Sequence, residues 1–238
     1  MTEACEIKYA EKFSNIHACD KLILKEYEAC NTDSSDHSNS NEVNTNNMPV
    51  MISGPSAVGK DTMINKLKAK YPKSIYKLPS FTTREKRPGE IEEVDYYYVT
   101  KEKFLEMKKE GLLFGVQEYN NNFYGSNLSK LKEALADKSK IVILNYNIET
   151  AIAVKDLHDF YFVAIFPPNE EALRERLIKR KTKPEEIESR MKQSVKEIQL
   201  MHEANFINFR MVNDDEERAF NELENQLKKI YPQLQYYE

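Results

Sequence analysis

The sequence predicts an α/β protein in which helices flank a mainly parallel central sheet. Two continuous apolar runs, 141–144 and 160–166, are typical of strands that are buried on both faces, as parallel strands are. Segments with helical spacing alternate with these runs along the chain, which indicates strand–helix–strand units. A glycine-bounded loop within 49–70 joins a further apolar run to a helical segment.

The remaining elements follow from local patterns. Further strands are expected at 75–78, 94–99 and 208–212, and a short strand or loop at 112–119. Helices are expected at about 101–110, 128–137, 170–181, 184–205 and 216–230. Thr100 is the expected N-cap of the first of these helices, and Gly111 its stop. We expect a loop at 80–90, because this segment is dense in arginine and closes with Pro-Gly.

The 238 residues suffice for one domain and an extension. Residues 1–30 have helix-like spacing in places and are predicted to be an N-terminal extension. Residues 31–48 are rich in Asn, Ser, Asp and Thr, a composition that predicts a flexible linker. The domain itself is expected at 49–235, and residues 1–48 are a candidate contact for a protein partner.

Composition excludes several function classes. The net charge of −4 argues against nucleic acid as the main partner. No apolar run approaches the roughly 20 residues that span a bilayer. Cys5, Cys19 and Cys30 match neither a zinc site nor a disulfide framework, so we expect reduced thiols. A cytoplasmic protein with small-molecule partners is the resulting expectation.

The loop Gly54-Pro55-Ser56-Ala57-Val58-Gly59-Lys60-Asp61-Thr62 carries the clearest chemistry. Its glycines let backbone N–H groups turn toward one anion, the following helix start adds its positive dipole end, and Lys60 can reach the outer phosphates of ATP. These nine residues are therefore the candidate ATP-binding loop. The pattern G-x-x-x-x-G-K-[ST] is broken at Asp61, which stands where a hydroxyl normally meets Mg²⁺.

Several separated motifs accompany this loop. They are Thr-Thr-Arg-x-x-Arg-Pro-Gly-Glu at 82–90, Asp-Tyr at 95–96, Tyr-Gly-Ser at 124–126, Pro-Pro at 167–168, an arginine-bearing segment at 174–190 and Val-Asn-Asp-Asp at 212–215. With this ordered set, the chain from about 50 to 230 resembles guanylate kinase, the family that phosphorylates GMP with ATP. The resemblance implies a P-loop kinase fold, an acceptor-binding region at about 80–127, a lid at about 174–192, and Mg²⁺ with ATP.

The resemblance also assigns roles to individual residues. The acceptor phosphate would be held by Arg84, Arg87, Tyr96 and Tyr124, which suits the forked donors of guanidinium and the neutral phenol donor. The other implied GMP-binding residues are Ser80, Glu90, Ser126 and Asn147, and Asn213 would contact the adenine of ATP. The implied catalytic residues are Lys60, Arg84 and the lid arginines Arg176, Arg180 and Arg190, since phosphoryl transfer depends on positioning and charge stabilisation. Ordinary helix ion pairs with Glu171, Glu175 or Glu186 are the alternative reading of the lid arginines.

The sequence departs from the family pattern near the base and the metal. Guanine is normally read there by a Ser, a Glu and an Asp. Ser80 keeps the first contact, the position of the Glu is occupied by Gly115 when counted back from Tyr124-Gly125, and the usual Asp-x-Asp is Asn145-Tyr146-Asn147. We do not expect Glu118 to substitute. Asp61 is a candidate Mg²⁺ ligand, because Mg²⁺ prefers oxygen, and Ala57 replaces a common Gly, which matters only if that position needs positive φ.

These observations predict a kinase that converts GMP to GDP with weakened guanine selectivity. Two alternatives stay open. One is a non-catalytic module of the same family that binds a protein or nucleotide, suggested by Asp61, Gly115, Asn145 and Asn147. The other is a related P-loop kinase for a different small phosphorylated acceptor.

Overall fold

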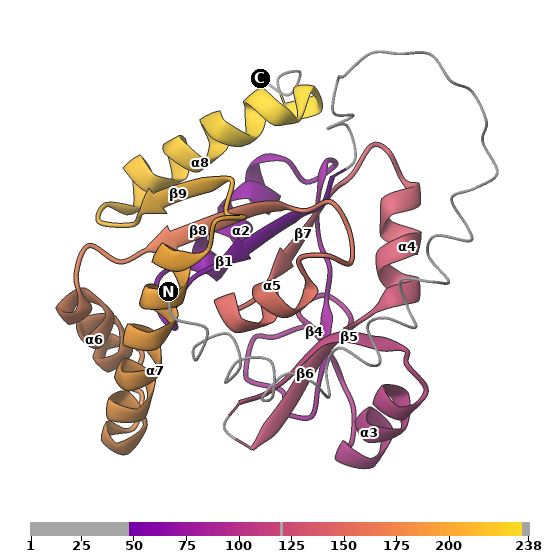
Figure 1. Ribbon diagram of the computed structural model, residues 1–238, viewed down its shortest axis with the longest axis horizontal. Helices are drawn as coiled ribbons and strands as arrows, with labels where there is room; N and C mark the ends of the chain where they lie inside the picture. The colour runs from indigo at the N-terminus through magenta and orange to yellow at the C-terminus, as the bar shows by residue number, and fades with distance from the viewer. Residues whose placement is uncertain (1–47, 120, 235–238) are drawn as a thin grey trace, which may run out of the picture.

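The computed structural model describes residues 48–119 and 121–234 (Figure 1). The extension predicted at 1–30 and the linker predicted at 31–48 lie outside the described residues, except for Met48. Among the helices that are described, none has both the length and the apolar character needed to cross a membrane.

The central sheet has five strands, all parallel, as the apolar runs predict. Their order is β2-β7-β1-β8-β9. The strands are β2 (Ile75–Lys77), β7 (Ile141–Asn145), β1 (Val50–Ser53), β8 (Tyr161–Phe166) and β9 (Phe209–Val212). Because all five run the same way, the loops that follow their carboxyl ends gather along one edge of the sheet, where open α/β sheets bind ligands.

Helices cover both faces of this sheet (Figure 1). On one face, Val50 and Ile52 pack in a core with residues of α2 (Lys60–Lys70), α6 (Glu170–Lys179) and α8 (Glu216–Ile230). On the other face, Met51 packs with residues of α4 (Leu128–Ala136) and α5 (Ile148–Val154). The long helix α7 (Pro184–Glu203) contributes to both cores. Burial on both faces explains the apolar runs of the three inner strands, β7, β1 and β8.

A second sheet lies beside the central one, with strand order β4-β3-β6-β5. Its strands are β4 (Tyr96–Tyr98), β3 (Ser80–Thr82), β6 (Asn122–Asn127) and β5 (Leu113–Tyr119). Helix α3 (Lys101–Lys109) packs Phe104 and Met107 on Leu113 of β5, which gives this sheet a small core of its own. As expected, Thr100 caps α3: its side chain accepts a hydrogen bond from the Lys103 amide.

Three local predictions were wrong or incomplete. Residues 80–82 are a strand and not a loop, because they pair with β4 and β6. The strand expected at 94–99 is shorter, since the Val94 and Asp95 amides bond to Ile91 O and form a turn before it. Helix α5 was not predicted. The described residues end with α8 and a short 3₁₀ turn, Pro232–Leu234.

Candidate active site

The phosphate loop joins β1 to α2 at the carboxyl edge of the sheet. Gly59 adopts a φ of 113°, and a Cβ there would lie 2.3 Å from Asn213 Nδ2, so only glycine fits between the loop and the end of β9. Ala57 has a φ of 64°, so this position does need the left-handed conformation, at some cost to an alanine.

Lys60 opens helix α2 and folds back over the loop. Its Nζ donates to Gly54 O at 2.6 Å and to Pro55 O at 3.1 Å. Burial lowers the pKa of Lys60, whereas Glu197 and Asp61 favour the charged form and Arg180 opposes it. The ammonium thus lies across the mouth of the loop, where an anion would replace the two carbonyl oxygens as its partner.

The three predicted lid arginines all lie close to this loop. Arg176 of α6 donates to Val58 O at 3.1 Å and to Asn213 O at 2.7 Å. Arg190 of α7 donates to Ser56 Oγ at 3.2 Å and pairs with Glu186 at 3.1 Å. Arg180, at the end of α6, is exposed and lies near enough to Lys60 to act on its charge. Of the three arginines, only Arg190 forms one of the helix ion pairs that the alternative interpretation expects, the pair with Glu186.

Asn213 braces the loop from the end of β9. The residue is 4% exposed, and its Nδ2 donates to Val58 O at 2.7 Å. Its Oδ1 is buried and has no hydrogen-bond partner among the described residues. Contact with adenine stays a prediction, and the contacts seen here make Asn213 a support for the loop.

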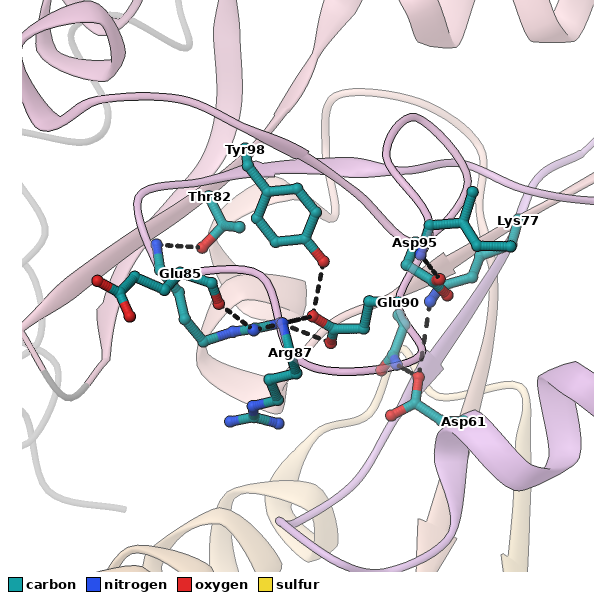
Figure 2. Close-up of polar contacts among 11 residues, drawn as sticks. Asp61, Lys77, Thr82, Glu85, Arg87, Glu90, Asp95 and Tyr98 are labelled. Carbon is teal, nitrogen blue, oxygen red and sulfur yellow. Dashed lines mark hydrogen bonds and ion pairs between the residues drawn. The ribbon is translucent and has the colours of Figure 1, made fainter.

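The arginine-rich segment is held together by one carboxylate, Glu90. Arg84 donates to both of its oxygens, at 3.0 and 2.8 Å, while Tyr98 Oη donates at 2.6 Å and the Arg87 amide at 2.8 Å. Burial alone would raise the pKa of Glu90, but these hydrogen bonds outweigh it and lower the pKa to about 2. The Arg87 guanidinium extends away from Glu90 (Figure 2) and is exposed. Glu90 therefore fixes the guanidinium of Arg84 and the backbone of Arg87, and it is not itself a donor to an anion.

Two tyrosines lie beside these arginines. The rings of Tyr96 and Tyr124 meet edge to face, with centroids 6.2 Å apart, and the Arg84 guanidinium lies 5.2 Å from the Tyr96 ring. Burial raises the pKa of Tyr96, and the nearby Asp61 raises it further. The Tyr96 phenol thus stays a neutral donor at ordinary pH, next to a guanidinium that is mostly buried. This is a site suited to a phosphate group.

A pocket-like set of neutral polar groups lies next to β5 and β6. Ser80 Oγ and Ser126 Oγ are 3.1 Å apart, and Thr150 Oγ1 donates to Gln117 Oε1 at 3.1 Å. Gly115 has a φ of 59° at a shift in the β5–β6 register between Phe114 and Gln117. A Cβ at Gly115 would lie 3.0 Å from both the Tyr146 ring and Thr150, so Tyr146 fills the space that a side chain would need.

The start of α2 faces the end of β7 and the end of β2. Asn145 Nδ2 donates to Asp61 Oδ1 at 2.8 Å, and Lys77 Nζ lies 3.7 Å from the same oxygen (Figure 2). The Asp61 side chain is 58% exposed, and the structure gives its second oxygen no contact within 48–119 and 121–234. Asp61 and the Asn145 carbonyl are oxygen donors of the kind that Mg²⁺ prefers, so these residues fit the ion. In the same residues there is no cluster of three or more carboxylate, histidine or cysteine side chains, so the ion would depend on ATP for most of its ligands.

Comparison with known proteins decides the family. The guanylate kinase family model matches residues 46–230. The guanylate kinase of Oceanobacillus iheyensis is 34% identical over 75% of this chain and 85% of its own length, and that of Lactococcus lactis is 38% identical over 71% and 82%. The crystal structure of guanylate kinase from Anaplasma phagocytophilum superimposes with a TM-score of 0.60 at 27% identity, covering 76% of this chain and 85% of that one.

The chain belongs to the guanylate kinase family. The family predicted from the motifs and the α/β fold are thereby confirmed. The structure brings the predicted donor residues together around the phosphate loop, and Arg84, Tyr96 and Tyr124 together in the second sheet. Asn147 is predicted to contact GMP, but its Oδ1 accepts from the Thr150 amide at 2.9 Å and caps α5. Glu118 is exposed in the β5–β6 hairpin, and the expectation that it does not replace the family's guanine-reading Glu stays a prediction.

Sequence reasoning did not single out two residues that the structure places beside the predicted ones, Gln117 and Lys77. A gapless count from Tyr124 leads to Gly115, whereas the register shift in β5 makes Gln117 the polar side chain that contacts Thr150. Lys77 looks like one of many surface lysines, but its side chain is only 10% exposed. The available signal was a charged residue at the end of a short strand of the parallel sheet.

Proposed function

We propose that this protein transfers the terminal phosphoryl group of ATP to GMP and releases ADP and GDP. The observation that carries the proposal is the adjacency of a donor loop and an acceptor-phosphate site. Lys77 lies 3.7 Å from Asp61, which follows Lys60, and 5.5 Å from the ring of Tyr96. Lys77 therefore lies near both the phosphate loop and the acceptor tyrosine, and this adjacency is what direct transfer between two phosphates requires.

On the acceptor side, Arg84 and Arg87 would hold the GMP phosphate by charge-assisted hydrogen bonds, and Tyr96 and Tyr124 would add neutral ones. Glu90 fixes the guanidinium of Arg84 and the backbone of Arg87 before GMP arrives. A phosphate oxygen is already a competent nucleophile, so no general base is needed. The role of these residues is to position the acceptor oxygen for attack on the terminal phosphate of ATP.

On the donor side, the backbone N–H groups of the loop and Lys60 would hold the outer phosphates of ATP. Arg176, Arg180 and Arg190 would neutralise the charge that spreads over the transferring group, which is the main demand of a loose transition state. Arg176 and Arg190 already donate to atoms of the loop, so their positions are set before ATP binds. Asp61 and Asn145 would hold Mg²⁺, which supplies charge neutralisation between the phosphates.

The base would be read by neutral groups. Ser80, Ser126 and Gln117 offer hydroxyl and amide partners to the guanine edge, and no carboxylate joins them in the contacts described for β5 and β6. A hydrogen bond to a charged group is worth about 1.5–3 kcal/mol. Its replacement by a neutral one supports the prediction that this enzyme selects GMP less strictly than a site with Glu and Asp would.

The test is a steady-state assay of the purified protein with Mg²⁺–ATP and a panel of GMP, dGMP, AMP, UMP and CMP. We expect turnover with GMP and measurable but smaller turnover with AMP. Equal rates with all five acceptors would contradict the guanine-reading role and favour a different phosphorylated acceptor. The alternative of a non-catalytic module gains no support, because such a module has no evident need for the retained phosphate-binding side chains. A protein partner for residues 1–48 stays a prediction.

A further inference from the structure

Lys77 is an unusual residue for its position. It ends β2 in the central sheet, its side chain is only 10% exposed, and no other residue of that strand is charged. Its Nζ makes an ion pair with Asp61 at 3.7 Å, but the hydrogen bonds of the described residues include none from this ammonium. Withdrawal of an ammonium from water is unfavourable unless its hydrogen bonds are replaced. The site therefore has a cation whose bonding capacity the protein leaves largely unused.

Asp61 does not account for this cation. Its Oδ1 already accepts the Asn145 amide at 2.8 Å, and its side chain is 58% exposed, so water can solvate the carboxylate. A separation of 3.7 Å is too long for a hydrogen bond. If Lys77 served only to neutralise Asp61, the shorter contact would be the expected one.

The surroundings of Lys77 point to an anion. Its Nζ lies 5.5 Å from the ring centroid of Tyr96, and the Arg84 guanidinium lies 5.2 Å from the same centroid. Two cations thus flank one phenol that is proposed to donate to the acceptor phosphate. Of these two cations, Lys77 is the one that lies beside the phosphate loop, because it pairs with Asp61.

We propose that Lys77 binds the phosphate of the acceptor nucleotide together with Arg84 and Tyr96. The inference rests on the proposed function and adds a residue to the acceptor side. From its position at the phosphate loop, the ammonium can keep an acceptor oxygen in line with the donor and lower the repulsion between the two phosphates. A flexible lysine suits this place, because its point charge can follow an oxygen that changes partners.

The test compares the binding of GMP and of guanosine to Lys77→Met, measured by calorimetry without ATP. Loss of a charge-assisted hydrogen bond should weaken GMP binding by about tenfold to a hundredfold and leave guanosine binding within about twofold. Lys73→Met is the matched control, since Lys73 is exposed just before β2 and the variant has the same net charge. Lys77→Arg should recover part of the GMP affinity, and it also serves if the methionine variant does not fold.

A double-mutant comparison separates a direct contact from an effect through Asp61. In an Asp61→Asn background, Lys77→Met should still weaken GMP binding about tenfold or more. Disappearance of the loss in that background, or an equal loss for guanosine, would overturn the proposal. Wild-type protein that binds GMP without turnover would contradict the proposed function alone, because this titration needs no turnover.

Discussion

At the scale of single residues, the proposed base site is shaped by the pair Gly115 and Tyr146. Gly115 has a left-handed backbone, and the Tyr146 ring occupies the space beside it. The buried Tyr146 hydroxyl lies near Ser126, whose Oγ is 3.1 Å from Ser80 Oγ. Two residues further along β5, Gln117 carries the polar group instead. The register shift in β5 therefore places the neutral amide of Gln117, and not a side chain at position 115, beside Thr150.

Gln117→Glu should strengthen guanine reading. A carboxylate accepts from the N1–H and N2–H₂ groups of guanine but repels the unprotonated N1 of adenine. We expect the ratio of kcat/KM for GMP to that for AMP to rise about tenfold. Gly115→Glu is the matched control, since it adds the same charge at a strained position and should lower the free energy of unfolding by about 1–3 kcal/mol without improving the ratio. An unchanged ratio in Gln117→Glu would exclude Gln117 from the base site.

At the scale of elements, the segment 83–95 is organised by the Glu90 carboxylate, which joins Arg84, Tyr98 and the Arg87 amide. The segment has little apolar burial of its own, since Ile91 and Val94 are 59% and 43% exposed. Polar contacts therefore hold this segment in place. The conformation of the proposed acceptor site should depend on the charge of the Glu90 carboxylate.

Glu90→Gln should change how stability depends on pH. The pKa of Glu90 is about 2 in the folded protein and 4.5 in its ordinary range, so its contribution is complete above 4.5 and is lost as pH falls toward 2. The free energy of unfolding of the wild type should therefore fall more steeply across this window than that of Glu90→Gln. Urea titrations at several pH values measure both slopes. Equal slopes would show that the Glu90 contacts do not persist in solution.

Helices α6 and α7 carry the arginines of the lid. Arg180→Ala should lower kcat by about a hundredfold or more, because a cation at the transferring group acts in the transition state. The KM for GMP should change by less than about threefold. Arg174→Ala is the control on the same helix, since Arg174 pairs at the surface with Glu188 and should leave kcat nearly unchanged. A loss confined to KM would give Arg180 a binding role only.

At the scale of the whole molecule, the parallel sheet was predictable because its inner strands β7, β1 and β8 are buried on both faces and appear in the sequence as apolar runs. The donor loop was predictable because its residues are adjacent in sequence. Helix α5 was not predicted because it is short and nearly every residue on it faces a core, so its sequence shows no alternation of apolar and polar faces. The grouping of Asp61, Lys77 and Asn145 could not be predicted, since these residues come from three elements that only the strand order brings together.

In the proposed function, the acceptor-phosphate site lies directly beside the donor loop, and direct transfer is the central claim. The measurement that tests it most directly follows the γ-phosphate of labelled ATP after mixing with GMP, in the wild type and in Lys60→Ala. We expect the label in the β-phosphate of GDP at a rate that falls about a hundredfold or more in Lys60→Ala. Label in GDP at equal rates in both proteins, or no labelled GDP with the folded wild type, would contradict the account.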